Sequence, residues 1–336
     1  MIHQKFRKWG LITGGLLILL AATALLALCT GSAGIEIQKI PDILFNQKRS
    51  AEYSILMDIR FPRILLGMAV GGSLSLAGTL LQGMFRNPLV EPYTLGISGG
   101  ASLGVCLNIL FQFHAILGII AFPLSGFIGA SLVIFLVYGL NRGNRSVRSN
   151  RMLLTGVMIS YVASSLVMLL MALSHSDDLQ SIVLWIMGSL DEPNTTLIRT
   201  ACIGALAGLF ISYFFCMDLN ALLLGDEEAA SLGINTARTK KFLFITASFL
   251  TGLSVAVAGI IMFVGLIVPH FVRMMTGPDH RILLIASFLA GAAFLTLSDV
   301  IARVIISPLE LPVGVITGII GGVMFIWALS RKKVSL

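Results

Sequence analysis

Asp226, Glu227 and Glu228 form a run of three acids between two apolar segments of membrane-spanning length. They belong to a polar insert, residues 218–241, with the sequence DLNALLLGDEEAASLGINTARTKK. Asp226 can cap a short helix, the two glutamates fall in its first turn where the helix dipole favours acids, and Gly233 can close it. Gly225 would hinge this helix to the preceding turn. Carboxylates so placed are suited to pairing with a cationic surface.

Two kinds of surface could receive such a helix. An interfacial helix that rests on lipid usually carries lysine and arginine on its polar face, whereas this insert would offer three acids to an anionic leaflet. A helix laid in the groove of a soluble protein tolerates acids at these positions. The sequence therefore favours a docking site for a protein outside the bilayer.

A second charged group consists of arginines at the ends of apolar runs. Arg60 and Arg63 lie in DIRFPRILLG and Arg303 lies in SDVIARVIISPLELP. Each could be a snorkelling anchor at the membrane surface. As a cluster of fixed cations they would suit an acidic soluble partner. Asp299 precedes Arg303 by four residues, a spacing that predicts an ion pair on one helix face.

The remaining reactive side chains carry less information. His270 follows Pro269 without a nearby set of histidines, cysteines or carboxylates, so a kinked helix end is favoured over a metal site. The four cysteines have no paired spacing and are predicted to be apolar packing residues. No glycine-rich GxxxxGK[ST] loop is present, which excludes an ATP motor of that type within the chain.

The composition defines the elements that must position these groups. Of the 336 residues 57% are hydrophobic and 12% are charged, and the mean hydropathy is +0.95. Such a chain is predicted to be an all-α polytopic membrane protein forming one domain over residues 1–336. Apolar runs of spanning length begin near Gly10, Ile64, Tyr93, Ala115, Met152, Thr200, Phe242, Ile282 and Pro312, and a short tenth run covers Phe263 to Val272.

The distribution of lysine and arginine predicts the orientation of these spans. With ten spans and the amino terminus inside, both termini and the acidic insert lie in the cytoplasm together with most of the 23 lysines and arginines. With nine spans the basic tail, Arg331 to Lys333, would end outside, so ten is the better count. The net charge of +7 then reflects membrane topology, and no nucleic-acid partner is needed to explain it.

The apolar cores of the predicted spans lack Asp, Glu, Lys and Arg. Transporters driven by ions keep such residues at membrane depth as relays or coordination sites. An ion-driven secondary transporter or a passive channel is therefore the less favoured alternative, and a sensor would need a signalling domain that the short loops do not provide. If transport is driven, the energy comes from another polypeptide.

Glycines recur every four residues in two predicted spans, a spacing that places them on one helix face. Close helix packing is the favoured explanation, ahead of a pore-lining role. The glycines are Gly96, Gly100 and Gly104 in one span and Gly314, Gly318 and Gly322 in the other.

The two halves of the chain also share a weak similarity in residue spacing. Ala77-Gly78 is followed ten residues after the glycine by Pro88, and Ala258-Gly259 is followed at the same distance by Pro269. This spacing predicts a weak internal, inverted repeat with corresponding broken helices.

The sequence resembles a known family, the permease subunits of ABC importers for iron chelates, haem and cobalamin, which is called the FecCD or cobalamin-permease type. The resemblance runs from about Asp58 to Trp327. The motifs that carry it are RFPRILLG at 60–67, LAGTLLQGMFRNPLVEPYTLGISGGASLG at 76–104, LLTGVMIS at 153–160, WIMGSL at 185–190, LLLGDEEAASLGIN at 222–235, GLIVPHFVRMMTGPDHR at 265–281 and LPVGVITGIIGG at 311–322.

The resemblance implies a set of partners. Members have ten spans per subunit and work as a pair with two cytoplasmic ATPases, which carry the ATP and Mg²⁺, and with a periplasmic or lipid-anchored binding protein. The chain would then be a transport subunit of the cell (inner) membrane with no catalytic residue and no cofactor or metal of its own. A homodimer is favoured, and a second, different permease stays open.

The resemblance also implies roles for particular residues. Residues that match the family's cytoplasmic coupling helix are expected to contact the ATPase: Gly225, Asp226, Glu227, Glu228, Ala229, Ala230, Leu232 and Gly233. Arg60, Arg63 and Arg303 match outer arginines that meet glutamates of the binding protein. The segments Leu153 to Leu173 and Ser174 to Leu190 are expected to line and gate the pathway between paired subunits.

The implied mechanism is alternating access, in which ATP closes the ATPases and the coupling helices transmit the movement. A ferric siderophore is the favoured substrate, with haem and cobalamin as open alternatives.

Overall fold

The computed structural model describes residues 2–31, 35, 37–46, 50–141 and 148–330 of the chain. Over these residues it contains helices and no strand. Seven helices are long and apolar enough to cross a membrane: α1 (Ile2–Cys29), α4 (Phe61–Phe85), α7 (Ala121–Leu140), α8 (Arg148–Leu173), α10 (Thr195–Phe214), α13 (Thr236–Ala258) and α15 (His280–Val304). Three shorter apolar helices complete the set: α5 (Ile97–Leu110), α14 (Val264–Thr276) and α16 (Val313–Ser330). In order along the chain they match the ten predicted runs.

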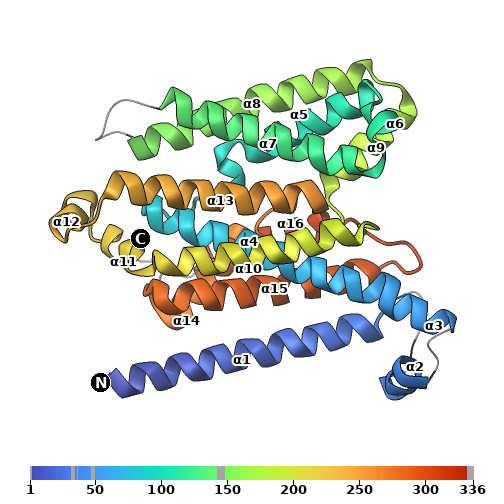
Figure 1. Ribbon diagram of the computed structural model, residues 1–336, viewed down its shortest axis with the longest axis horizontal. Helices are drawn as coiled ribbons and strands as arrows, with labels where there is room; N and C mark the ends of the chain where they lie inside the picture. Colours follow the sequence, from blue (N-terminus) through green and yellow to red (C-terminus); the bar gives the residue numbers. More distant parts are fainter. Residues whose placement is uncertain (1, 32–34, 36, 47–49, 142–147, 331–336) are drawn as a thin grey trace.

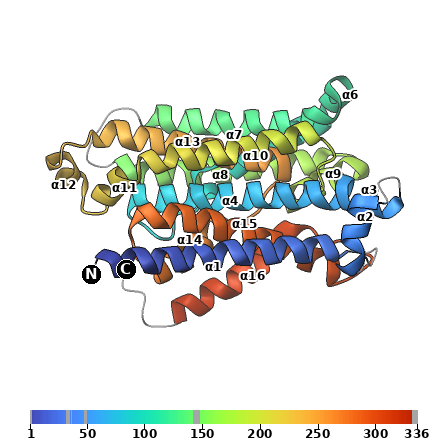
Figure 2. The ribbon, with the colours of Figure 1, turned by 60° about the horizontal axis from the view of Figure 1, so that its bottom comes forward.

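Short helices lie at the two ends of the bundle. One end holds α2 (Ile40–Asn46), α3 (Ala51–Ser54), α6 (Phe113–Leu117) and α9 (Ser176–Met187). The other end holds α11 (Cys216–Leu222), α12 (Asp226–Ser231) and the first turn of α1 (Figures 1 and 2). The start of the first span and the acidic insert therefore share one end, as the charge distribution predicted.

The centre of the bundle is α4. In the most apolar 18-residue window of the span that contains α4, 89% of the residues are buried inside the protein. The corresponding share is 11% for α1 and 17% for α8. Helices α10, α13, α14 and α15 pack around α4, while α1 lies outside α15 and α8 lies at the opposite edge (Figure 1). Helix α4 also buries Ser73, Ser75, Thr79 and Gln82, and polar side chains in a membrane bundle are expected to face neighbouring helices.

The first glycine series forms a packing face, as predicted. An added Cβ at Gly100 would lie 2.5 Å from the carbonyl oxygen of Gly129 in α7, and Gly96 and Gly104 are equally crowded by neighbouring helices. In the second series Gly314 is closely packed, since an added Cβ would lie 2.6 Å from the Ile260 carbonyl oxygen, but no heavy atom of the described residues lies within 4 Å of such a Cβ at Gly318 or Gly322.

An inverted repeat is visible in the elements. In each half a long helix, a break and a short helix follow one another, as α4, residues 86–96 and α5, then as α13, residues 259–263 and α14. The long helices run in opposite directions. Helix α4 starts at the end of the bundle that holds α3, whereas α13 starts at the end that holds α12 (Figure 1). Gly96 (φ 84°) and Phe263 (φ 69°) are both left-handed N-caps of the short helices.

The residue pairs proposed from the sequence do not correspond in this repeat. Gly78 lies in the middle of α4, whereas Gly259 ends α13. Pro88 lies in the first break, but Pro269 lies inside α14 and not at a helix end. The equal spacing of the two Ala-Gly and proline pairs was therefore a coincidence.

Candidate functional site

The acidic insert folds as predicted into a short helix between two turns. Gly225 has φ 137° and separates α11 from α12, whose first turn contains all three acids. At the other end Gly233 has φ 87°, its N–H donates to the Ala230 carbonyl, and the Ile234 N–H donates to the Ala229 carbonyl. These bonds satisfy the last carbonyls of α12.

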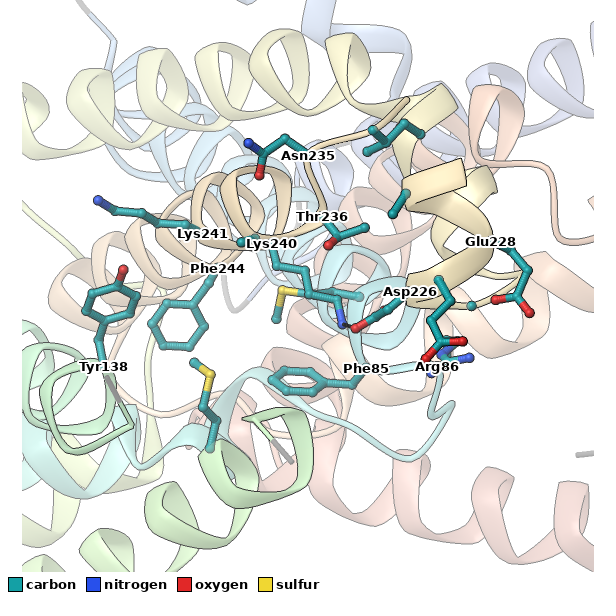
Figure 3. Close-up of a pocket in the computed structure, with 17 residues that line it drawn as sticks. Phe85, Arg86, Tyr138, Asp226, Glu228, Asn235, Thr236, Lys240, Lys241 and Phe244 are labelled. Atoms are coloured by element: carbon teal, nitrogen blue, oxygen red, sulfur yellow. Dashed lines mark hydrogen bonds and ion pairs between the residues drawn. The ribbon is translucent and has the colours of Figure 1, made fainter. Parts of the chain in front are cut away.

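The predicted capping role of Asp226 is wrong. Gly225 is the N-cap and Asp226 is already helical. The Asp226 carboxylate instead accepts from the Lys240 ammonium of α13 at 2.6 Å (Figure 3). Thr239 donates similarly to Asp218 of α11 at 2.9 Å. These two contacts fix α11 and α12 against the start of α13.

The expected contact residues divide into two groups. Glu227, Glu228, Ala230, Leu232 and Gly233 are exposed. Ala229 is completely buried and Gly225 is also buried, while Asp226 is partly buried. Direct contact of Ala229 with a partner is therefore excluded by this structure, since its methyl group packs toward the bundle.

A pocket of about 840 Å³ opens beside α12. Figure 3 shows its side chains converging from the end of α4, from α7 and from the start of α13. Its apolar wall consists of Met84, Phe85, Tyr138, Met152, Ile234 and Phe244, and its charged rim consists of Arg86, Asp226, Glu227, Glu228, Lys240 and Lys241. The sequence did not predict this pocket, because its walls come from separate segments that span residues 84–244.

The three arginines cluster at the opposite end, but they are not an exposed cationic surface. Arg60, Arg63 and Arg303 are 4%, 9% and 4% exposed. Arg63 donates to Asp299 from Nε and Nη2 at 2.9 Å and to Glu310 at 2.6 Å. Arg303 pairs with Asp299 at 3.0 Å, which confirms the pair predicted from their spacing.

Two of these guanidinium groups bind the carboxyl-terminal end of α1. Arg60 donates to the Leu28 carbonyl at 2.6 Å, and Arg303 donates to the carbonyls of Thr30 at 2.9 Å and Ala27 at 3.4 Å. The last carbonyls of a helix lack intrahelical donors and carry the negative end of its dipole, so cations are stabilising there. The three guanidinium groups are therefore occupied within the chain, Arg60 and Arg303 by carbonyls at the end of α1 and Arg63 by carboxylates.

The other end of α1 is held in the same manner. Lys5 pairs with Asp279 at 3.0 Å, and the Trp9 ring lies within cation–π distance of both Lys5 and Arg281. The Arg281 hydrogen bonds to Asp279, supported by donation from Lys5 and Asn220, hold the pKa of the Asp279 carboxyl well below its ordinary value.

The segments expected to form the pathway lie at the edge of the molecule. One side of α8 packs on α5 and α7. The other side exposes Leu154, Met158, Tyr161, Val162, Leu166 and Leu169. The following α9 buries Ile182 and packs on α5, and the Ser189 N–H beyond it donates to the Ala258 carbonyl at 2.9 Å.

His270 gains no ligand set from the fold. It is partly buried in α14, and the described parts of the chain contain no group of three or more histidine, cysteine, aspartate or glutamate side chains placed to hold a metal ion.

Comparison with known proteins adds independent observations. The profile of the FecCD transport family matches residues 18–331. The chain is 37% identical to the hemin transport system permease protein HmuU of Yersinia pestis, covering 96% of each chain. It is 39% identical to the Fe(3+) dicitrate transport system permease protein FecD of Escherichia coli, covering 84% of this chain and 86% of FecD. It is 35% identical to the vitamin B12 import system permease protein BtuC of Klebsiella pneumoniae, covering 98% and 96%.

Solved structures agree with the fold. One described as a metal-chelate type ABC transporter in an inward-facing conformation matches with a TM-score of 0.83 and 30% identity, over 96% of this chain and 99% of that one. PsaBC from Streptococcus pneumoniae matches with a TM-score of 0.54 at 14% identity, covering 86% of this chain and 94% of that one, a likeness of fold alone.

Proposed function

Because the chain belongs to the FecCD transport family, we propose that it is the permease subunit of a binding-protein-dependent ABC importer for a metal chelate. It resides in the cell (inner) membrane with both termini in the cytoplasm. The observation that carries the proposal is the exposed acidic turn of α12 beside an open pocket, at the end that holds the start of α1.

The cytoplasmic ATPase docks on what we call the coupling surface, formed by Glu227, Glu228, Ala230 and Leu232 together with the pocket beside them. The charged rim and the apolar wall of the pocket support this assignment, because they can receive both polar and apolar side chains of a partner. ATP and Mg²⁺ are bound by that ATPase. The bonds from Asp226 and Asp218 to α13 give α12 a firm connection to the spans, through which its displacement can reach them.

A second permease subunit, most simply an identical copy, packs against the exposed side of α8. The pathway then runs between the two copies, lined by residues 153–173 and gated by residues 174–190. The low burial of α8 within one chain supports this arrangement, since its apolar side lacks an intramolecular partner among the described residues.

Disulfide trapping tests the pairing. We expect Tyr161→Cys, on the exposed side of α8, to cross-link two copies in membranes under mild oxidation, and Phe135→Cys, equally exposed on α7, to remain monomeric. Both variants are made after replacement of the native cysteines, Cys29, Cys106, Cys202 and Cys216. Cross-linking at position 135 but not at 161 would place the partner on a different face.

The binding protein docks at the end that holds α2, α3 and α9. In this proposal Arg60, Arg63 and Arg303 still meet acidic side chains of that partner, with one added requirement. Their guanidinium groups must first leave the α1 carbonyls, Asp299 and Glu310, to which they are bound here.

The substrate is a ferric siderophore in the favoured form of the proposal, with haem or cobalamin as alternatives. Relatives whose names state hemin, Fe(3+) dicitrate and vitamin B12 transport support a chelate as the class.

Reconstitution in liposomes tests the function. The chain is purified with its ATPase and binding protein, and uptake of ferric siderophore, hemin and cobalamin is measured with and without ATP. We expect one of the three to accumulate only when ATP and the binding protein are both present. Accumulation driven by an ion gradient without the ATPase would instead establish the secondary-transporter alternative.

A further inference from the structure

The two helix breaks of the inverted repeat meet inside the bundle. The break at 259–263 is a turn between α13 and α14. Side chains from the other break accept from two of its N–H groups. Glu91 Oε1 accepts from the Phe263 N–H at 2.6 Å, and the Tyr93 hydroxyl accepts from the Ile261 N–H at 3.2 Å.

Further contacts join α4, which precedes the first break, to α14, which follows the second. The Gln82 amide of α4 donates to the carbonyls of Gly265 and Leu266 at 3.2 Å, and its oxygen accepts from Arg273 at 3.0 Å. Gly78 lies directly against the Gly265 backbone, where no Cβ would fit. Helix α4, the first break and α14 are thus connected as one body.

The opposite side of the 259–263 turn contacts the end of α9 and the start of α16. An added Cβ at Gly188, just after α9, would lie 2.6 Å from the Ile260 carbonyl oxygen. An added Cβ at Gly314 in α16 would lie at the same distance from that atom. Together with the bond from Ser189 to Ala258, these approaches fix the end of α9 on the turn.

The backbone of the turn is itself strained. Phe263 has φ 69°, a left-handed conformation that is unusual for a bulky residue. Such a conformation persists only where the surroundings over-determine it. Here Glu91 holds the Phe263 N–H, and Gly321 of α16 lies against the Phe263 side chain.

We infer that the 259–263 turn is the joint that positions α9 relative to the body of α4, the first break and α14, and that Glu91 and Tyr93 are the positioning residues that hold it. The inference rests on the proposed function in one respect, that α9 belongs to the gate. Loss of either side chain frees the turn from one side, so α9 no longer follows movements of the inner helices.

The first measurement uses the chain alone. Spin labels are attached at Leu184 of α9 and Met274 of α14, both exposed, after replacement of the native cysteines. We expect a single narrow distance distribution in the parent. We expect broadening in Glu91→Ala and in Tyr93→Phe, the milder change, which removes only the hydroxyl acceptor.

The second measurement uses the importer in liposomes. Substrate imported per ATP hydrolysed is expected to fall about tenfold in Glu91→Ala, as for loss of one buried hydrogen bond, while ATP hydrolysis continues. Glu91→Gln, which keeps an acceptor oxygen, should recover most of the ratio. Tyr213→Phe on the exposed side of α10 is the control for Tyr93→Phe and should change neither readout.

The outcomes separate the possibilities. The joint is refuted if Tyr93→Phe and Glu91→Ala keep the parent's distance distribution and its ratio of substrate imported to ATP hydrolysed. A decrease in thermal stability alone would not rescue it, because a merely structural cap lowers stability without changing either readout. If Glu91→Ala does not fold, Tyr93→Phe decides in the same way. If the parent neither associates with an ATPase nor imports a chelate, the proposed function fails, and the distance measurement still tests the joint.

Discussion

Replacing Glu227 and Glu228 by lysine is expected to weaken binding of the ATPase by about a hundredfold and to abolish ATP-driven uptake. Both glutamates are exposed in the first turn of α12, and neither forms an ion pair with another described residue. Placing like charges against a cationic surface costs several kcal/mol, and each 1.4 kcal/mol is about a factor of ten in affinity. Co-purification and titration of the ATPase in detergent measure the loss.

Two further variants make this result specific. Lysines at the start of α12 also oppose the helix dipole. The variant Glu227→Gln plus Glu228→Gln removes the attraction without adding repulsion. Its affinity for the ATPase should lie between that of the parent and that of the charge reversal. Asp177→Lys plus Asp178→Lys reverses an equivalent acidic pair in the first turn of α9, at the other end of the bundle. That control should bind the ATPase normally. Unchanged affinity in the α12 reversal would refute the coupling surface.

Asp299→Ala is expected to lower the free energy of unfolding by about 3–5 kcal/mol. Asp299 is 2% exposed, accepts from Arg63 and forms an ion pair with Arg303, and both arginines are also buried. Its removal leaves two guanidinium groups close together without their shared anion. Thermal or denaturant unfolding in detergent measures the change.

Asp58→Ala is the matched control, because Asp58 lies at the same end of the molecule but is exposed. It should change the free energy of unfolding by no more than about 0.5 kcal/mol. Adding Arg303→Met to Asp299→Ala should recover part of the loss, since Arg63 retains Glu310. If Asp299→Ala and Asp58→Ala have the same free energy of unfolding, the ion pairs of Asp299 contribute nothing to stability.

Hydrophobic run length and glycine spacing predicted the spans and the helix of the insert. The short run predicted at Phe263 to Val272 corresponds to α14 (Val264–Thr276), because apolar length is a local property of the sequence. The Asp299–Arg303 pair was predicted for the same reason, since residues four apart meet on any helix.

What failed depended on contacts between distant segments. No local pattern indicates that Arg60 bonds to Leu28, or that Asp226 prefers Lys240 to a capping position. Nor does one indicate that a Cβ at Gly318 would meet no described atom within 4 Å. Glu310 and Glu91 were missed likewise. Each is a single carboxylate in a connecting segment, and its partners become visible only when the helices are assembled.

The attachment of α1 has a consequence for biosynthesis. Its firmest contacts are with α15, and the bond from Arg303 to Thr30 spans 273 residues of sequence. At about 5–20 residues per second, Asp279, Arg281 and Arg303 emerge from the ribosome roughly 14 to 55 s after α1 itself. During that interval Arg60, which is made soon after α1, can already hold the Leu28 carbonyl, whereas the start of α1 lacks its contacts with Asp279 and Arg281. A nascent chain arrested before residue 279 would therefore leave α1 attached at one end, whereas completion of α15 fastens both of its ends.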